Sequence, residues 1–291
     1  MARQTRDIGA SVRARLLNLA REKGQAFDLL LTRYAAERLL YRLSNTPHRD
    51  RFVLKGAMLM TTWFDAPHRP TRDVDFLGYG DSTPESMLAA FREICAIEEG
   101  DGVIFDVDAL RVELIREELE YGGLRLRTTA RLAGARITVV IDIGFGDAIE
   151  PGIEEINLPA LLDFPEPRLR AYARETVVAE KFQALVMLGL ANSRMKDYYD
   201  IWMLSRSYDF DAERLSCAIA ATFARRGTAI PVKVPDALTA AFATDATKQR
   251  QWAAFVRDLA TEVPALETIV TDLADFLMPY AQQAKHRSGG G

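Results

Sequence analysis

The hydrophobic positions at the start of the chain repeat at helical spacing. Val12, Leu16 and Ala20 lie four residues apart, so they share one face of a helix predicted over residues 8–24. A broader apolar face predicts a second helix over residues 26–44. Two amphipathic helices therefore open the chain, and we expect them to pack on a core formed by the residues that follow.

Short apolar runs of strand length come next. Residues 51–55 and 71–77 each form such a run, and each is short enough to be a strand. Prolines between them predict a loop over residues 65–70. Helical spacing returns on either side of the second run, and it predicts helices over residues 57–64 and 85–98.

Residues 103–145 carry the strongest strand patterns. Over residues 124–129, leucine and threonine alternate with arginine and threonine, which is typical of a strand with one buried face. Residues 136–145 are almost continuously apolar. A run of this kind predicts a central strand that is covered on both faces.

The pattern changes near residue 150, where prolines become frequent, and from residue 174 onward only helical spacing is found. We therefore expect a mixed α/β fold of the α+β class with a separate helical lobe. The predicted parts are N-terminal helices over 1–50, a core over 51–168, a helical lobe over 169–284 and a disordered tail over 285–291.

Composition removes several classes of protein. Hydrophobic residues make up 48% and charged residues 27% of the 291 residues, as in globular proteins. No apolar run approaches the roughly 20 residues of a membrane span, and the N-terminus lacks the apolar stretch of a secretory signal. Two cysteines and three histidines argue against a disulfide framework or a histidine-based catalytic site. We expect a cytoplasmic protein, not bound to membranes, whose chemistry rests on carboxylates, lysines and arginines.

Two carboxylates on one predicted strand are the leading candidate site. Asp73 and Asp75 lie two residues apart, so both point to the same face. Carboxylates placed in this way repel unless a cation lies between them, and Mg²⁺ prefers carboxylate and phosphate oxygens. Two such ions can assist phosphoryl transfer. A solvated strand end is the alternative explanation of this pair.

Two other features support a catalytic site at Asp73 and Asp75. Gly56 joins a predicted strand to a predicted helix, and backbone N–H groups at such a junction can hold a phosphate. Asp142 interrupts the apolar run 136–145, where an unpaired carboxylate is costly to bury. A metal ion shared with Asp73 and Asp75 would explain it; hydrogen bonds to the following turn are the alternative.

This order of elements resembles the DNA polymerase β-like nucleotidyltransferases. The closer resemblance is to the AbiEii family, the nucleotidyltransferase toxins of abortive-infection, type IV-like toxin–antitoxin systems. It rests on four segments, Leu54-Lys-Gly-Ala57, Arg72-Asp-Val-Asp75, Glu180-Lys181 and Arg194-Met-Lys-Asp-Tyr-Tyr-Asp200. The resemblance implies a polymerase β-like core with a mixed sheet, a helical C-terminal lobe, and transfer of a nucleotide from an NTP to a tRNA 3′ end or another RNA, which blocks translation. It also implies two Mg²⁺ ions and a cognate AbiEi-like antitoxin.

The resemblance also implies roles for individual residues. The metal ligands would be Asp73, Asp75 and Asp142, with Asp142 also helping to deprotonate the acceptor hydroxyl. The nucleotide-binding residues would be Lys55, Gly56, Ala57, Arg72 and Lys181. Asp197 and Asp200 would orient Lys181 or act as a general base.

Alternatives remain for the downstream residues. Lys181 lies at the flank of an apolar helix face, where it is also explained as a surface lysine with a buried stem. Asp197 and Asp200 share a helix face and are also explained as partners in salt bridges. Arginines are frequent in the N-terminal part, and they form either a basic cleft for RNA or a solvated surface; they include Arg51, Arg69, Arg72, Arg125, Arg127, Arg131 and Arg136.

Two rival functions also remain. One is a polymerase β-like enzyme that nucleotidylates a protein or a small molecule. The other is a catalytically silent module that binds nucleotides or proteins, for which Ala57 in place of the usual serine is a possible sign.

Overall fold

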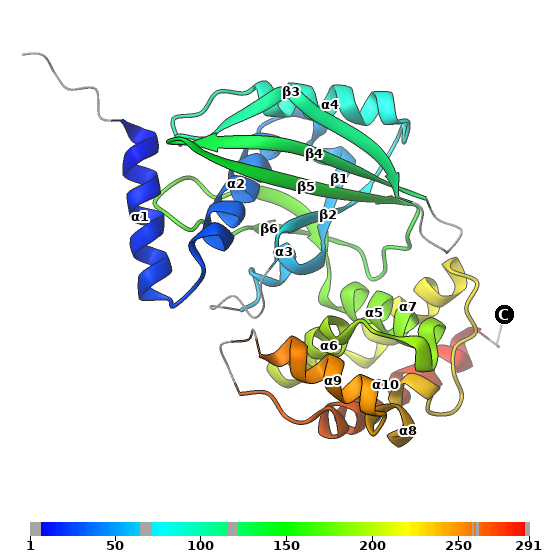
Figure 1. Ribbon diagram of the computed structural model, residues 1–291. Helices are drawn as coiled ribbons and strands as arrows, with labels where there is room; N and C mark the ends of the chain where they lie inside the picture. Colours follow the sequence, from blue (N-terminus) through cyan, green and yellow to red (C-terminus); the bar gives the residue numbers. More distant parts are fainter. Residues whose placement is uncertain (1–6, 65–70, 116–121, 258, 260–261, 289–291) are drawn as a thin grey trace, which may run out of the picture. The chain divides into compact units, whose positions relative to one another are not determined.

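The computed structural model describes residues 7–64, 71–115, 122–257, 259 and 262–288. The chain divides into two compact units (Figure 1). The sheet unit comprises residues 1–146 and 154–171, and the helical unit comprises residues 147–153 and 172–291. The mixed α/β fold with a helical C-terminal part is as predicted.

Within the described residues, seven strands form one mixed sheet in the order β3-β4-β5-β2-β1-β7-β6. Strands β2 and β5 run parallel, as do β1 and β7, whereas β1–β2, β3–β4 and β4–β5 are antiparallel. Their bounds are β1 Phe52–Lys55, β2 Asp73–Gly78, β3 Ile104–Ile115, β4 Gly123–Leu132, β5 Ala135–Phe145, β6 Ile153–Asn157 and β7 Arg168–Tyr172.

Helices of the sheet unit follow the predicted pattern, except that the helix predicted over residues 57–64 ends at Met60. Asp7 caps the first helix by accepting a hydrogen bond from the Ala10 backbone N–H at 3.0 Å. Helix α2 contacts β5, and α4 contacts β3. The helices are α1 Ile8–Glu22, α2 Phe27–Ser44, α3 Gly56–Met60 and α4 Pro84–Ala96, with a 3₁₀ helix η1 at Pro47–Arg51.

Strand β5 is buried on one face only. Ile137, Val139 and Ile141 are buried, whereas the alternate positions Val140 and Asp142 are half-buried. The prediction that this strand is covered on both faces is therefore wrong. The reason is that its apolar run includes Val140 on the face that carries charged side chains from β2 and β4. This face, which bears Asp73, Asp75, Arg125, Arg127 and Asp142, is called the charged face below.

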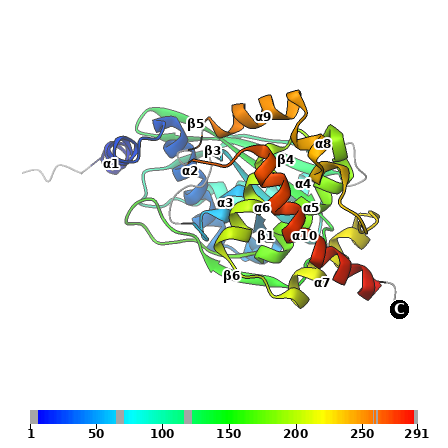
Figure 2. The same cartoon turned by 90° about the horizontal axis from the view of Figure 1, so that it is seen from below.

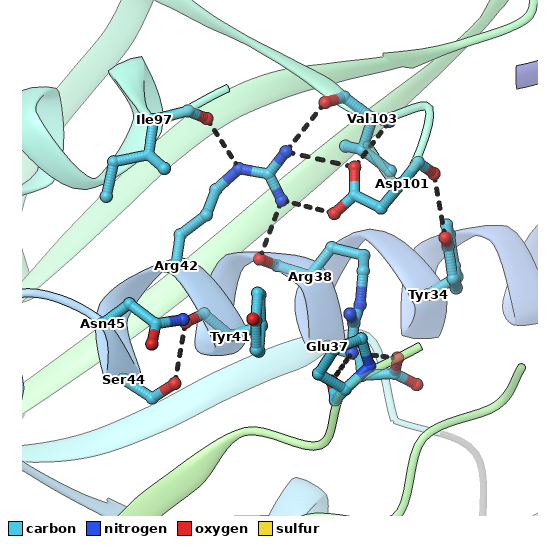
Figure 3. Close-up of polar contacts among 11 residues, drawn as sticks. Tyr34, Glu37, Arg38, Tyr41, Arg42, Ser44, Asn45, Ile97, Asp101 and Val103 are labelled. Atoms are coloured by element: carbon cyan, nitrogen blue, oxygen red, sulfur yellow. Dashed lines mark hydrogen bonds and ion pairs between the residues drawn. The ribbon is translucent and has the colours of Figure 1, made fainter. Parts of the chain in front are cut away.

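A buried polar cluster fastens α2 to the segment between α4 and β3 (Figure 3). The fully buried Arg42 side chain donates to both carboxylate oxygens of Asp101, at 2.7 and 3.1 Å. It also donates to the carbonyls of Ile97, Val103 and Arg38, at 2.9, 2.9 and 3.0 Å. Each of these guanidinium N–H groups donates to an oxygen, which offsets the cost of burying the charge.

The helical unit is a bundle in which α7 packs against α5 and α10, while α6 contacts α5, α9 and α10 (Figures 1 and 2). Phe182 of α5 and Phe223 of α7 meet in its core, with ring centroids 5.4 Å apart. The bounds are α5 Arg174–Leu188, α6 Met195–Ser207, α7 Ala212–Arg225, α8 Ala240–Ala243, α9 Ala246–Val256 and α10 Leu266–Ser288, with 3₁₀ helices η2 Gly189–Ala191 and η3 Asp236–Leu238.

Helix α10 continues to Ser288. The predicted disordered tail is therefore wrong over residues 285–288, and its remaining residues 289–291 lie outside the described part of the chain. None of the helices in the described residues has the length and apolar character needed to cross a membrane.

Candidate active site

The structure brings the three predicted carboxylates of the sheet unit onto the charged face. Asp73 is the first residue of β2, and Asp75 follows two residues later on the same face. Asp75 is in register with Asp142 of the neighbouring parallel strand β5, and Asp73 is in register with Val140. Side chains in register on adjacent strands are direct neighbours. The carboxylates of Asp75 and Asp142 therefore lie side by side, with Asp73 one step along the same face.

Gly56 allows the Asp75 carboxylate to approach the start of α3. Its φ of +70° is in the left-handed region, which disfavours every residue with a Cβ. A Cβ placed there would lie 1.9 Å from Oδ2 of Asp75. Lys55 immediately precedes Gly56 and is in register with Asp75 on the paired strand. The strand-Gly-helix junction and the carboxylate pair thus form one local arrangement.

Ala57 is buried, with 6% of its surface exposed. It is the second residue of the five-residue helix α3. Its methyl group is part of the core of the sheet unit, so any direct interaction of this residue with a ligand would come from its backbone.

Arg125 binds both oxygens of Asp142. The two residues are in register on the antiparallel strands β4 and β5. Nε of Arg125 donates to Oδ1 at 2.7 Å, and a terminal nitrogen donates to Oδ2 at 2.6 Å. These hydrogen bonds raise the pKa of the Arg125 guanidinium above its ordinary value. The arrangement is the bidentate, charge-assisted pairing that fixes an arginine and a carboxylate in one orientation.

A row of charged residues crosses the sheet at this level. In register from β3 to β1 it contains Glu113, Arg125, Asp142, Asp75 and Lys55. Three acidic and two basic residues therefore occupy neighbouring positions on one face. In the sequence, Arg125 is one of many arginines. The signal that points to it is its position on an alternating strand that pairs with the strand of Asp142.

The arrangement and chemistry of the oxygen donors decide whether a divalent cation fits the charged face. Among the described residues, no group of three or more His, Cys, Asp or Glu side chains is arranged to hold a metal ion. Asp73 and Asp75 offer the oxygen donors that a hard cation prefers. Asp142 offers the same chemistry, but Arg125 binds both of its oxygens. In donor chemistry, though not yet in arrangement, the three carboxylates suit such a cation, and at Asp142 it would share the two oxygens with Arg125.

Arg72 points to a different partner from the one that the sequence suggested. A terminal nitrogen lies 3.0 Å from Oδ2 of Asp28 on α2, and both side chains are about two-thirds exposed, at 66% and 64%. Exposed ion pairs of this kind are weak. Arg72 is therefore not held firmly in this position and remains able to contact another anion.

The predicted residues of the helical unit form a buried ionic cluster of their own. Nζ of Lys181 on α5 lies 2.6 Å from Asp197 and 2.8 Å from Asp200, both on α6. Arg194 pairs with the second oxygen of Asp197 at 2.8 Å. The Asp197 and Asp200 side chains are 1% and 0% exposed, and that of Lys181 is 14% exposed. Lys181 is therefore an ion-paired residue and not a surface lysine.

A second ionic cluster in this unit was not anticipated from the sequence. Arg226, after α7, pairs with Asp147 at 3.0 Å and with Glu180 at 3.3 Å. Glu180 also accepts a hydrogen bond from the hydroxyl of Tyr172 at 3.0 Å. Asp147 follows β5 in the chain, so the cluster fastens residues 147–153 to the helices of this unit. Glu180, which precedes Lys181, serves here as a structural anchor.

Several arginines of the sheet unit are also paired. Arg127 pairs with Glu113 at 2.8 Å, and Arg131 pairs with Asp106 at 2.7 Å. Both pairs join β4 to β3. Arg51 donates to the Asp81 carbonyl at 3.2 Å and to Ser86 at 3.1 Å. Arg69 lies outside the described residues. The arginines on β4 thus bond mainly within the sheet, which weakens the case for a continuous basic cleft there.

Comparison with known proteins gives the family. A sequence profile described as "Nucleotidyl transferase AbiEii toxin, Type IV TA system" matches residues 38–278. That span covers well over half of the chain and includes every predicted site residue. The chain belongs to the AbiEii family. It is accordingly a nucleotidyltransferase of the toxin–antitoxin type, as the sequence motifs predicted.

Two solved structures resemble this chain, and one of them is similar enough to bear on the fold. The crystal structure of JHP933 from Helicobacter pylori matches with a TM-score of 0.52 and 14% identity, over 90% of this chain and 96% of the other. A second H. pylori structure, described as that of a "putative nucleotidyltransferase", matches over the same shares with 16% identity and a TM-score of 0.48. At such identity the likeness to JHP933 speaks to the fold alone. None of the curated proteins matches the chain.

Proposed function

We propose that this AbiEii protein transfers a nucleoside monophosphate from an NTP to the 3′ hydroxyl of an RNA, with tRNA as the favoured acceptor, and that transfer requires Mg²⁺. The single observation that carries the proposal is the side-by-side placement of Asp75 and Asp142, with Asp73 beside them on the same face. Blocking the 3′ end of tRNA would stop translation, which agrees with a toxin. Family membership supports a nucleotide substrate and an antitoxin partner.

The proposed reaction is a substitution at the α-phosphorus. The 3′ hydroxyl oxygen forms a bond to that phosphorus, the bond to the oxygen bridging to the β-phosphate breaks, and pyrophosphate leaves with the bonding electrons. The hydroxyl proton passes to a carboxylate oxygen of Asp142, which acts as general base. Divalent cations held by Asp73, Asp75 and Asp142 would supply charge neutralisation at the phosphates.

Residues beside the carboxylates would bind the nucleotide. Lys55 brings a compact positive charge next to Asp75, and a lysine of this kind suits a phosphate oxygen. The backbone N–H groups of Gly56 and Ala57 would hold a second oxygen. Arg72, whose exposed pair with Asp28 is easily broken, would neutralise charge as pyrophosphate leaves.

The proposal extends to the ionic cluster of the helical unit. Asp197 and Asp200 pair with the Lys181 ammonium at 2.6 and 2.8 Å, and this pairing offsets the cost of burying the charges. A lysine fixed in this way offers a phosphate a cation whose position is already set. We propose that Lys181 binds a phosphate of the nucleotide and that the two aspartates hold it for that purpose.

The test is a transfer assay with each α-³²P-labelled NTP, Mg²⁺ and total tRNA. Wild-type protein is compared with the double variant Asp73→Asn, Asp75→Asn, which keeps side-chain shape but removes both charges. Asp163→Asn is the matched control, because that carboxylate is 96% exposed and pairs only at the surface with Arg15. Label in tRNA with the wild type and the control, absent in the double variant and absent with EDTA, is the expected result.

Other outcomes of this assay would favour one of the two rival functions. Label in protein and not in RNA would favour an enzyme that nucleotidylates proteins. Measurable NTP binding without transfer to any acceptor would favour a silent module, and full transfer by the double variant would overturn the assignment of the carboxylates.

An antitoxin and a cellular site complete the proposal. We propose that an AbiEi-like antitoxin opposes this toxin and that it acts in the cytoplasm, where NTPs and tRNA are available. Induced expression of the wild type should arrest growth, whereas the Asp73→Asn, Asp75→Asn variant should not. Co-expression of the cognate antitoxin should restore growth.

A further inference from the structure

Arg125 and a divalent cation require the same oxygen atoms. Both carboxylate oxygens of Asp142 accept hydrogen bonds from Arg125, at 2.7 and 2.6 Å. We propose that Arg125 is a positioning residue that competes with the metal for Asp142, and that it thereby sets the affinity of the site for divalent cations. This inference rests on the proposed function, because it assumes that Asp73, Asp75 and Asp142 are the metal ligands.

The position of Arg125 is fixed by the sheet. Its neighbours Leu124 and Leu126 are in register with Ile143 and Ile141 across the β4–β5 ladder, and all four of these apolar side chains are buried on the opposite face. A slip of β4 by one residue would move Leu124 and Leu126 out of the core and onto the charged face. Arg125 is therefore held opposite Asp142 by the core, independently of the ionic bond between them.

Charge explains why the pairing exists. Asp73, Asp75 and Asp142 would place three negative charges at adjoining positions, and like charges on neighbouring strands destabilise a sheet. The carboxylates of Asp142 and Asp73 both help to raise the pKa of Arg125. The guanidinium therefore neutralises part of this acidic group. A bound dication would do the same, and the two cations would repel each other.

Geometry makes the two cations compete for Asp142. The Asp142 side chain is 20% exposed and that of Arg125 is 35% exposed, so the pair is accessible from one side only. The guanidinium fork covers both carboxylate oxygens in one plane. A cation that binds Asp142 must share these oxygens with Arg125, because each of them keeps only one further lone pair, and the guanidinium charge opposes its binding. Once released from Asp142, the Arg125 side chain would still lie at the edge of the three carboxylates, because its backbone remains part of β4, two residues from Arg127.

Arg127 provides the matched control. It lies on the same strand and the same face, and it carries the same charge. It pairs with Glu113 at 2.8 Å and lies in register with Val140, not with Asp142. Removing Arg127 therefore removes a nearby positive charge without freeing an oxygen of Asp142.

The experiment measures binding of Mn²⁺ alone to the full-length protein by electron paramagnetic resonance, without nucleotide. Arg125→Gln should bind Mn²⁺ roughly tenfold more tightly than the wild type, because a charge-assisted hydrogen-bonded competitor has been removed. Arg127→Gln should change the affinity by no more than about twofold, since a half-exposed charge is screened. In the Asp142→Asn background, Arg125→Gln should give no gain, because the contested oxygens no longer carry the charge.

Three results would overturn the inference. One is an Arg125→Gln variant with native circular dichroism and unchanged or weaker Mn²⁺ binding. Another is an equal gain in Arg127→Gln, which would mean that charge acts through space. The third is a gain that persists in the Asp142→Asn background. If Arg125→Gln does not fold, Arg125→Lys replaces it as the test variant. Lysine keeps the charge but loses the planar fork, so Arg125→Lys should also bind Mn²⁺ more tightly than the wild type.

Failure of the inference is distinguishable from failure of the proposed function. If Asp73→Asn, Asp75→Asn binds Mn²⁺ as well as the wild type does, the metal site itself is wrong, and the inference falls with it. If that variant loses Mn²⁺ while Arg125→Gln gains nothing, only the role of Arg125 is wrong.

Discussion

The Asp75 carboxylate lies where a side chain at residue 56 would have to be. A Cβ added to Gly56 would be 1.9 Å from Oδ2 and 2.6 Å from Cγ of Asp75, which is far inside van der Waals contact. Gly56 also has a φ of +70°, in the region that favours glycine. Two independent constraints therefore require glycine at this position, and one of them depends directly on a candidate metal ligand.

Gly56→Ala is accordingly expected to displace the Asp75 carboxylate and to abolish nucleotide transfer. The backbone strain and the clash together should cost about 1–3 kcal/mol of unfolding free energy. Gly80→Ala is the control, because Gly80 has a similar φ of +79° but nothing within 4 Å of the added Cβ. Urea unfolding and the transfer assay on both variants test this. Equal loss of activity in both would contradict a specific role for the space that Asp75 occupies.

Lys181→Met is expected to destabilise the protein and to abolish transfer. The substitution leaves the carboxylates of Asp197 and Asp200, which are 1% and 0% exposed, without their shared cation. Removing one partner from a buried ionic group costs about 3–5 kcal/mol. Urea unfolding should show this loss for Lys181→Met but not for Lys196→Met, since Lys196 is exposed on the same helix as the aspartates.

Lys181→Arg separates folding from function in this cluster. Arginine keeps the charge but presents it as a wide planar fork instead of a compact ammonium. We expect this variant to stay folded at the assay temperature and to transfer nucleotide at a small fraction of the wild-type rate. Full activity would mean that Lys181 only supplies charge to the core of the helical unit.

The sequence predicted the carboxylates of the sheet unit better than it predicted their partners. Asp73 and Asp75 belong to one strand, so their shared face follows from local geometry alone. The pairing of Arg125 with Asp142 depends on the register of β4 against β5, which nothing local specifies. The apolar run of β5 suggested burial on both faces, but Val140 lies among charged neighbours on the charged face. Pairing between strands decides both the partner of Asp142 and the burial of β5.

Helix α2 also shows that a local pattern does not reveal a distant partner. Its apolar positions predicted a helix correctly, yet Glu37, Arg38 and Arg42 are among its buried residues. The partner that makes burial of Arg42 possible is Asp101, 59 residues further along the chain. A pattern of polar and apolar residues assigns an arginine to the solvent face unless this partner is known.

Arg42→Met tests the importance of that buried pair. The substitution leaves Asp101 buried without its bidentate partner, and it should lower the free energy of unfolding by about 3–5 kcal/mol. Arg72→Met removes an exposed pair with Asp28, and it should change stability by no more than about 0.5 kcal/mol. Thermal and urea unfolding of both variants provide the comparison. Similar losses in the two would show that burial does not distinguish these ion pairs.

Cys95 gives the fold a specific dependence on alkaline pH. Burial raises the pKa of its thiol to about 12 in the folded protein, and the charge of Arg42 opposes this shift. In the unfolded chain the thiol ionises near its ordinary pKa of about 8.5. A group with a raised folded pKa stabilises the fold fully below the unfolded pKa, and this contribution is lost as pH rises toward the folded pKa.

Unfolding free energy should therefore fall between pH 8 and pH 10 by about 1–2 kcal/mol more in the wild type than in Cys95→Ala. The alanine variant loses some packing at every pH, so the comparison concerns the slope with pH and not the absolute stability. Cys217→Ala is the control, because it removes the same group from a partly buried position, so a change of slope in both variants would show that the effect is not specific to Cys95. Urea titrations at the two pH values measure all three proteins, and identical slopes in the wild type and Cys95→Ala would show that the Cys95 thiol is not protected from ionisation by the fold.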